Sequence, residues 1–210
     1  SKMTQSELMT MMVGGFATVA GGVLAFYVSW LTNIPGIAGH LLSASMMSAP
    51  AALALSKIIY PETEVSPTIG DVSISNDSNT SNIMEAIGNG ATDGLKLAAN
   101  VAAMLIAFVS IIALFNYLLS FAGLSMESIL GFIFKPLAWS MGISWEDSSV
   151  IGSLLGKKIV FTELIAFSDL KDLIDNQAIS ERSAIIASYA LCGFANFGSI
   201  GIQLGGIGGI

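Results

Sequence analysis

One carboxylate stands apart from the other charged residues of the chain. Glu163 lies between the apolar segments Ile-Val-Phe (159–161) and Leu-Ile (164–165). An ionised carboxylate accepts charge-assisted hydrogen bonds and can hold two adjacent hydroxyl groups of a ligand. An ionisable side chain at membrane depth is a candidate functional residue by default. The alternative is an interfacial, solvated glutamate that pairs with Lys157 or Lys158.

Asn196 and Ser199 form a second candidate group. They are three residues apart, so they fall on one side of a helical turn, beside Gly193 and Gly198. The asparagine amide and the serine hydroxyl each supply a hydrogen-bond donor and an acceptor, which suits a ligand rich in hydroxyl groups. The alternative is that both side chains bond between helices, as polar residues commonly do in membrane bundles.

The segments that carry these residues belong to an unusually apolar sequence. Of 210 residues, 53% are hydrophobic and 11% are charged, whereas a soluble domain has roughly 25% charged residues. The mean hydropathy is +0.75. A water-soluble fold of this composition would expose large apolar patches, so the sequence predicts a membrane protein in contact with lipid. The net charge of −7 argues against a nucleic-acid partner.

Charged residues are segregated, and the gaps between them predict membrane spans. Residues 8–56 contain no Asp, Glu, Lys or Arg, which is room for two helices of about 20 residues each. An Asn-Ile-Pro-Gly turn signal at 33–36 separates them. We therefore expect spans at residues 9–31, 41–59 and 97–121, and an uncharged, glycine-rich segment at 183–210. We expect a mobile polar loop at 65–82 and an interfacial amphipathic helix at 82–96.

Residues 144–181 predict two short helices in place of a complete span. Ser144 and Asp147 resemble a capping box that opens a helix. That helix, from residue 145 to about 158, would be roughly 21 Å long, too short to cross about 30 Å of hydrocarbon. A second arm follows from about residue 164 to 174. We expect a re-entrant hairpin with Glu163 at its tip, lining a protein cavity.

Two segments far apart in the chain resemble each other. Residues 6–18 and 183–196 each begin at a serine and run through apolar residues to Gly-Phe-Ala, followed by Thr18 or Asn196. Corresponding glycine-interrupted spans in two halves indicate the substrate site of a secondary transporter. The predicted fold is therefore an all-α membrane protein, an inverted-repeat transporter with discontinuous helices and a re-entrant helical hairpin.

Six motifs, in order along almost the whole chain, resemble the concentrative nucleoside transporter family. They are Gly-Phe-Ala-Thr-Val-Ala-Gly-Gly-Val-Leu (15–24), Ser-Ala-Ser-Met-Met-Ser-Ala-Pro-Ala-Ala-Leu-Ala (43–54), Pro-Glu-Thr-Glu (61–64), Ala-Thr-Asp-Gly (91–94), Gly-Lys-Lys-Ile-Val-Phe-Thr-Glu (156–163) and Cys-Gly-Phe-Ala-Asn-Phe-Gly-Ser-Ile-Gly-Ile (192–202). The resemblance implies a homotrimeric, multi-pass symporter of the inner or plasma membrane. It also implies a fragment that runs from the first broken transport-domain helix to the second, without the N-terminal scaffold and the first hairpin.

The resemblance implies a role for individual residues in binding a nucleoside. Glu163, Asn196 and Ser199 would bind the ribose hydroxyls. Phe194 would form an apolar wall, and Val23 would contact the base. For Val23 the alternative is an ordinary position in the core or against lipid.

The resemblance further implies a sodium site. Thr18 would bind Na⁺ through its hydroxyl and Val19 through its backbone carbonyl, since hard cations take oxygen ligands. The alternative for Thr18 is a hydrogen bond within its own helix. The sequence departs from the family at Thr162, where the family commonly has asparagine, and this residue could alter hairpin packing or specificity.

The predicted organisation has five parts. Residues 1–60 hold the first broken helix and the following span, 61–96 the polar loop and amphipathic helix, 97–143 a scaffold-type span and connector, 144–181 the hairpin and 182–210 the second broken helix. The predicted function is nucleoside uptake with a cation, Na⁺ being favoured and a proton the alternative, with no organic cofactor. A passive channel is a weaker option. An intramembrane hydrolase at Ser199 needs a general base, and the only histidine, His40, is expected at the interface, so we expect no enzyme.

Overall fold

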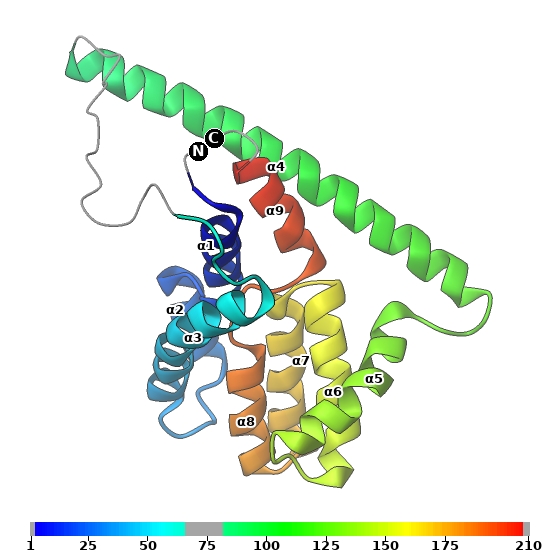
Figure 1. Cartoon of the computed structure of the whole chain (residues 1–210). Helices are drawn as coiled ribbons and strands as arrows, with labels where there is room; N and C mark the ends of the chain where they lie inside the picture. The colour runs from blue at the N-terminus through cyan, green and yellow to red at the C-terminus, as the bar shows by residue number, and fades with distance from the viewer. Residues whose placement is uncertain (1–2, 66–81, 208–210) are drawn as a thin grey trace.

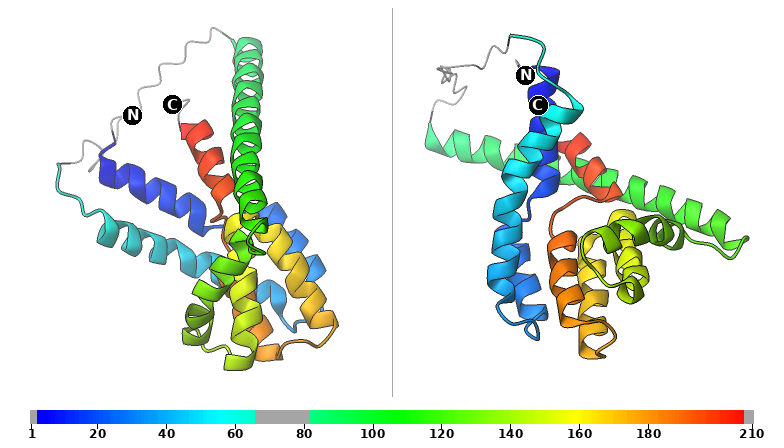
Figure 2. Two further views of the ribbon diagram at one scale, coloured as in Figure 1. Left: turned by 90° about the vertical axis from the view of Figure 1, so that its right-hand side faces the viewer. Right: turned by 60° about the horizontal axis from the view of Figure 1, so that its bottom comes forward.

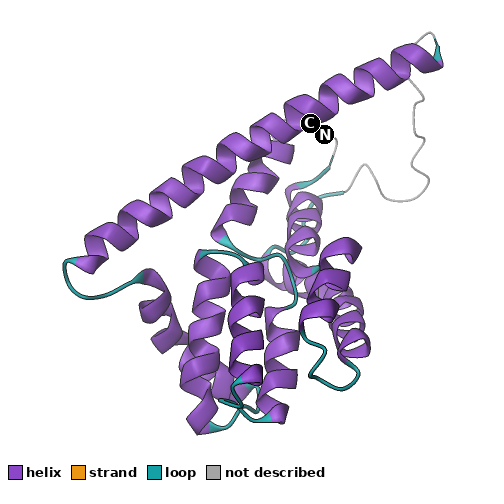
Figure 3. Cartoon of the chain, turned by 180° about the vertical axis from the view of Figure 1, so that it is seen from behind, coloured by secondary structure: helices purple, strands orange, loops and turns teal. Residues whose placement is uncertain are grey.

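The computed structural model describes residues 3–65 and 82–207, and that part of the chain is helical without strands (Figures 1 and 3). The helices are α1 (Gln5–Ala17), α2 (Gly21–Trp30), α3 (Ile37–Ile59), α4 (Ile83–Ser120), α5 (Met126–Ser140), α6 (Trp145–Val160), α7 (Glu163–Asp175), α8 (Glu181–Leu191) and α9 (Phe197–Ile207). The all-α prediction is confirmed. Three segments are long and apolar enough to cross a membrane: Gln5–Trp30, Ile37–Ile59 and Ile83–Ser120.

The first apolar segment is a broken helix, as the sequence predicts. α1 ends at Ala17 and α2 begins at Gly21, and both Thr18 and Ala20 have extended backbone conformations. α1 opens with a complete capping box between Thr4 and its N3 glutamate, which satisfies backbone N–H groups at its start. Residues 18–20 lie in neither helix, and the Ala20 carbonyl accepts the first hydrogen bond of α2, from the Leu24 N–H at 2.9 Å.

Helix α4 corrects the expectation of an amphipathic helix at 82–96 followed by a separate span at 97–121. The two are one helix of 38 residues, capped by Asn82, whose side chain accepts from the Glu85 N–H. Glycines at 88, 90 and 94 do not interrupt it, because each costs only about 1 kcal/mol relative to alanine and no proline is present. The expected loop at 65–82 lies largely outside the described residues. Among described α4 residues only Ile112 is buried, and the helix runs along one side of the other elements (Figure 2).

The core lies where α2, α3, α6, α7 and α8 meet (Figure 1). Its fully buried side chains are mostly apolar: Tyr27, Leu31, Leu41, Ile151, Phe167, Leu170 and Leu191. α5 packs closely on α6, since a Cβ added to Gly152 would lie 2.7 Å from the Gly131 carbonyl oxygen. This core fixes the short helices that carry the candidate site.

Helices α6 and α7 agree with the two short arms predicted at about 145–158 and 164–174. Ser144 caps α6 by accepting from the Asp147 N–H at 3.2 Å. Hydrogen bonds from Ser183 and Ser180 lower the pKa of the Asp147 carboxyl. The arms are joined at Phe161 and Thr162. Their re-entrant placement in a bilayer stays a prediction, and so does the five-part division.

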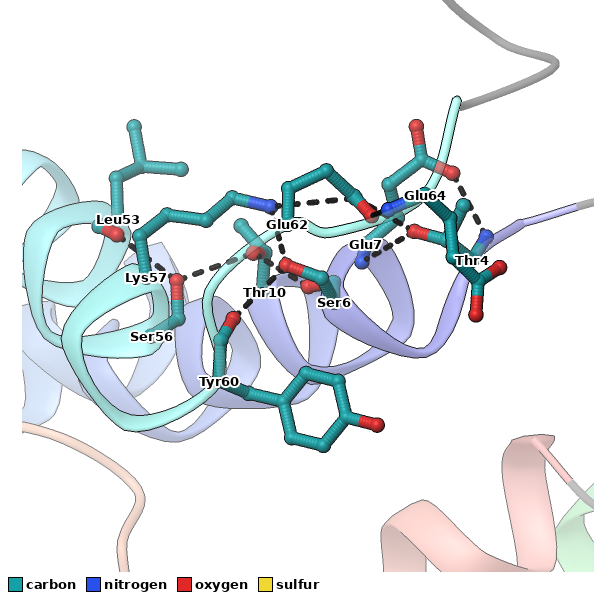
Figure 4. A network of polar contacts seen from close by, with 10 residues as sticks. All are labelled: Thr4, Ser6, Glu7, Thr10, Leu53, Ser56, Lys57, Tyr60, Glu62 and Glu64. Carbon is teal, nitrogen blue, oxygen red and sulfur yellow. Dashed lines mark hydrogen bonds and ion pairs between the residues drawn. The ribbon is translucent and has the colours of Figure 1, made fainter.

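A polar cluster joins the start of α1 to the end of α3 (Figure 4). Its members are Thr4, Ser6, Thr10, Ser56, Lys57 and Glu62. Ser6 donates to the Tyr60 carbonyl at 2.9 Å and accepts from the Lys57 ammonium at 2.7 Å. Thr4 donates to Glu62 at 2.7 Å, so the Pro-Glu-Thr-Glu segment fastens α1. We call this group the α1–α3 polar cluster.

Candidate functional site

The breaks of the two discontinuous helices meet in the middle of the fold. α8 ends at Leu191 and α9 begins at Phe197, so residues 192–196 are outside either helix. Gly193 has φ +113°, and a Cβ there would lie 3.1 Å from the Ala17 carbonyl oxygen. A residue with a side chain would be strained at this φ. The two Gly-Phe-Ala segments identified as a repeat are therefore in contact at their breaks.

Glu163 lies at this meeting point, at the first position of α7, and is 5% exposed. Its Oε1 accepts from the Tyr27 hydroxyl at 3.3 Å, and its Oε2 accepts from the Asn196 amide at 3.1 Å. Asn196 Oδ1 in turn accepts from the Ser199 N–H at 2.7 Å. The structure thus brings together Glu163, Asn196 and Ser199. The alternative of a solvated, interfacial Glu163 does not agree with its burial.

This group keeps hydrogen-bonding capacity for a ligand. A carboxylate offers about four lone-pair sites, and the two protein donors take one on each oxygen of Glu163. The Ser199 hydroxyl is buried and has no partner within the described residues. A buried hydroxyl without a partner is energetically costly, so a ligand that reached it would recover that cost.

A cavity of about 480 Å³ opens beside Glu163. It is lined by Gly15, Thr18, Val19, Ala20, Val23, Glu163 and Phe194, which includes five of the seven residues singled out from the sequence. Asn196 lines a different, mainly apolar cavity of about 300 Å³, and Ser199 lines neither. The first cavity combines apolar walls with one charged group, the usual construction of a small-molecule site.

Thr18 and Val19 share this cavity with Glu163. The Thr18 hydroxyl donates to the Gly14 carbonyl at 3.1 Å, which is the within-helix bond weighed from the sequence. That bond uses the hydroxyl hydrogen and leaves the oxygen lone pairs for a cation. The C-terminal end of α1 brings a partial negative charge to this break, and the N-terminal end of α2 brings a partial positive one.

The sequence does not anticipate Tyr27 in the site, and it offers Lys158 only as a partner of a solvated, interfacial Glu163. Tyr27 is 1% exposed, stacks on Phe167 with ring centroids 4.1 Å apart, and donates to Glu163. Lys158 is 7% exposed and donates to the carbonyl oxygens of Ala190 and Cys192. A buried tyrosine usually finds a partner for its hydroxyl, but the sequence does not indicate a partner 136 positions away. His40 is outside the cavity lining and bonds Tyr189 at 3.0 Å.

Residues 40–210 match a family model described as "Na+ dependent nucleoside transporter C-terminus". The chain is 42% identical over 226 residues to "Solute carrier family 28 member 3" of Mus musculus, covering 97% of the chain and 31% of the relative. It is 42% identical over 216 residues to "Uncharacterized transporter YutK" of Bacillus subtilis, covering 99% and 52%. It is 40% identical over 226 residues to "Sodium/nucleoside cotransporter 1" of Mus musculus, covering 98% and 34%. The chain thus spans about a third to a half of the length of these relatives.

Solved structures of CNTnw are similar to the chain along almost all of its length. A double variant in an outward-facing state has a TM-score of 0.84 at 38% identity, covering 99% of the chain and 50% of that structure. An inward-facing, substrate-bound state has a TM-score of 0.71 at 39% identity, covering 98% and 49%. The arrangement of helices is therefore more similar to the outward-facing structure than to the inward-facing one.

Proposed function

Because the chain belongs to the concentrative nucleoside transporter family, we propose that it binds nucleosides beside Glu163 and takes part in carrying them across the cell membrane with a cation. The family consists of transporters, so the chain is not an enzyme. It is part of a multi-pass membrane protein, with three described segments long and apolar enough to cross a bilayer.

The observation that supports nucleoside binding is the buried Glu163 carboxylate at the wall of the 480 Å³ cavity. The 2′- and 3′-hydroxyls of a ribose would donate to its remaining lone pairs. Asn196 would bond one of these hydroxyls, and the Ser199 hydroxyl would reach the sugar once a ligand or a side-chain movement gave it access. The base would pack on Val23 and Phe194. Charge-assisted bonds to adjacent hydroxyls distinguish a ribose from apolar ring compounds of similar size.

The coupling cation is proposed to be Na⁺, bound by the Thr18 hydroxyl and the Val19 carbonyl with further oxygen ligands from outside this chain's described residues. Two observations support this site: both residues line the nucleoside cavity, and relatives are named sodium/nucleoside cotransporters. Sodium bound there would tighten nucleoside binding, and reciprocity requires nucleoside to tighten Na⁺ binding by the same factor. A proton is the alternative cation.

A homotrimer is the proposed assembly. α4 is 38 residues long and exposes apolar side chains along most of its described length, as expected of a helix that packs against lipid and neighbouring protomers. The number of three protomers is what the resemblance to the family implies. Light scattering of the detergent-solubilised protein, corrected for bound detergent, would give the mass of three protomers.

Uptake of labelled uridine and adenosine by the intact protein in sealed vesicles tests the proposed function. An inward Na⁺ gradient should raise the concentration of at least one of the two nucleosides inside the vesicles above its concentration outside. Uptake that never exceeds the external concentration would indicate a channel, and uptake driven only by a pH gradient would replace Na⁺ with protons.

A pair of Thr18 variants tests the cation site. Thr18→Val keeps the shape of the side chain but removes the oxygen, whereas Thr18→Ser keeps the oxygen. Because hard-cation sites depend on the number of oxygen ligands, Thr18→Val should require a much higher Na⁺ concentration for half-maximal uptake. Identical Na⁺ titrations for both variants and the wild type would remove Thr18 from the site.

A further inference from the structure

A buried lysine lies at the break between α8 and α9 and has no part in the contacts proposed for nucleoside or cation. Lys158, in the last turn of α6, is 7% exposed. Its ammonium donates to the carbonyl oxygens of Ala190 at 3.1 Å and Cys192 at 3.4 Å. A buried ammonium is costly unless it is paired or hydrogen-bonded, so this position requires an explanation.

The two carbonyl groups explain one half of the arrangement. α8 ends at Leu191, so the carbonyls of its last turn cannot pair with N–H groups further along a continuous helix. The end of α8 is also the negative end of its dipole. The Lys158 ammonium binds these carbonyls and thereby fastens α6 to the segment that leads into Asn196.

Glu163 explains the other half. Lys158 precedes it by five residues, across the turn that joins α6 to α7. Burial lowers the pKa of Lys158, and the nearby charge of Glu163 opposes that lowering. The neighbouring lysine provides a contrast within the same turn of helix. Lys157 is partly exposed and pairs with Asp169 at 2.5 Å on the outer side of the hairpin. Of the two lysines, only the buried Lys158 bonds to the broken helix.

We propose that Lys158 is a positioning residue of the nucleoside site. It holds the α8–α9 break in the conformation that presents Asn196, and it balances the charge of Glu163 so that a buried carboxylate is retained for the ribose. This inference rests on the proposed function. In this proposal, Lys158 and Glu163 together carry no net charge before any ligand arrives.

The first test measures nucleoside recognition with a matched pair of lysine variants. Lys158→Met should weaken uridine binding about tenfold, the typical effect of disturbing a charge-assisted hydrogen bond, although Lys158 does not line the cavity. The preference for uridine over 2′,3′-dideoxyuridine should fall as well, because the ribose contacts are what Lys158 positions. Lys157→Met should leave both quantities within about twofold of the wild type. Equal effects of the two variants, or an unchanged preference in Lys158→Met, would overturn the proposal.

The second test measures charge balance through stability, which does not require a nucleoside. Lys158→Met should lower the thermal unfolding midpoint in detergent, since it leaves the Glu163 carboxylate buried without its counter-charge. The same substitution in a Glu163→Gln background should lower the midpoint much less. An equal decrease in both backgrounds would overturn the charge balance, and so would a double variant that fails to fold when Glu163→Gln alone folds.

The two tests separate this inference from the proposed function. If the wild-type protein binds neither uridine nor adenosine, the proposed function fails. The stability comparison between the two backgrounds then still decides whether Lys158 and Glu163 balance each other.

Discussion

The described part of the protein contains two polar clusters that each include buried serine and a glutamate, and they differ in how completely their hydrogen bonds are formed. In the α1–α3 polar cluster, Ser6, Thr10 and Ser56 each have a partner, and Lys57 pairs with Glu62 at 3.8 Å. In the Glu163 site, the Ser199 hydroxyl has no partner within the described residues, and a cavity of about 480 Å³ adjoins the carboxylate.

This difference distinguishes a cluster that joins helices from the cluster proposed to bind a nucleoside. Both link elements that are distant in the sequence, α1 with α3 and α2 with α7 and α9. A fully satisfied polar network makes a fold more rigid and specific, whereas an incompletely satisfied one costs free energy. The Ser199 hydroxyl without a protein partner is therefore the group that the proposed nucleoside site would use, and its role can be tested by substitution at matched positions.

The largest expected effect is that of Glu163→Gln on nucleoside affinity. The substitution keeps the size of the side chain but removes the charge, and it replaces one acceptor with a donor. Losing a hydrogen bond to a charged group costs about 1.5–3 kcal/mol, or roughly 10- to 150-fold in affinity. Calorimetric titration of the purified protein with uridine measures the change. Unchanged affinity in a folded, membrane-inserted variant would refute the ribose assignment.

Ser6→Ala should have its effect on stability and none on binding. Ser6 is 1% exposed and bonds both the Tyr60 carbonyl and the Lys57 ammonium, and its loss leaves those groups without this partner. The expected cost is about 1–3 kcal/mol of unfolding free energy, seen as a lower thermal midpoint. Uridine affinity at a temperature where the variant is folded should equal that of the wild type; a decrease would show that the two clusters are coupled.

Ser199→Ala removes a buried serine hydroxyl from the Glu163 site, and its expected effects are opposite to those of Ser6→Ala. Removing a buried hydroxyl that has no protein partner should leave the thermal midpoint of the ligand-free protein unchanged or raise it. Uridine affinity should fall by about 2- to 12-fold, as for one neutral hydrogen bond. A lower midpoint, as expected for Ser6→Ala, would mean that Ser199 serves packing.

The effect of Asn196→Ala is compared between two ligands, uridine and 3′-deoxyuridine. Uridine binding should weaken by about 2- to 12-fold through the lost bond, and binding of 3′-deoxyuridine should weaken less, because that analogue lacks the hydroxyl. Titrations of the variant and the wild type with both ligands measure the difference. Equal losses for both ligands would show that Asn196 acts only by holding Glu163.

The sequence predicts local features of this molecule better than its long-range contacts. Composition and charge spacing identify the membrane helices, and the repeated Gly-Phe-Ala identifies both breaks, because these signals lie within single segments. The resemblance to the family singles out Glu163, Asn196 and Ser199, which the fold does bring together. The same local reasoning wrongly divides α4 at residue 97, since a change of polarity along a helix does not require a break in its backbone.

The contacts of Tyr27 and Lys158 depend on tertiary packing, and sequence patterns do not indicate them. Within its own apolar segment nothing distinguishes Tyr27 from its neighbours, and its partner Glu163 is 136 positions away in the sequence. Lys158 stands beside Lys157 in the same motif, and only the packing of α6 on α8 distinguishes the buried lysine from the one paired at the surface.

The smallest expected effect is that of Tyr27→Phe, and it decides whether the Glu163 carboxylate is oriented from α2. The Tyr27 hydroxyl donates to Oε1 at 3.3 Å, a long hydrogen bond, so its loss should cost about 0.5–1 kcal/mol, or twofold to fivefold in uridine affinity. The phenylalanine ring can keep the stacking on Phe167, so the fold is preserved. In a Glu163→Gln background the same substitution should have little further effect, because the acceptor it orients is already altered. Full additivity of the two losses would show that Tyr27 and Glu163 act independently, and the contact between α2 and α7 would then belong with the structural cluster rather than with the site.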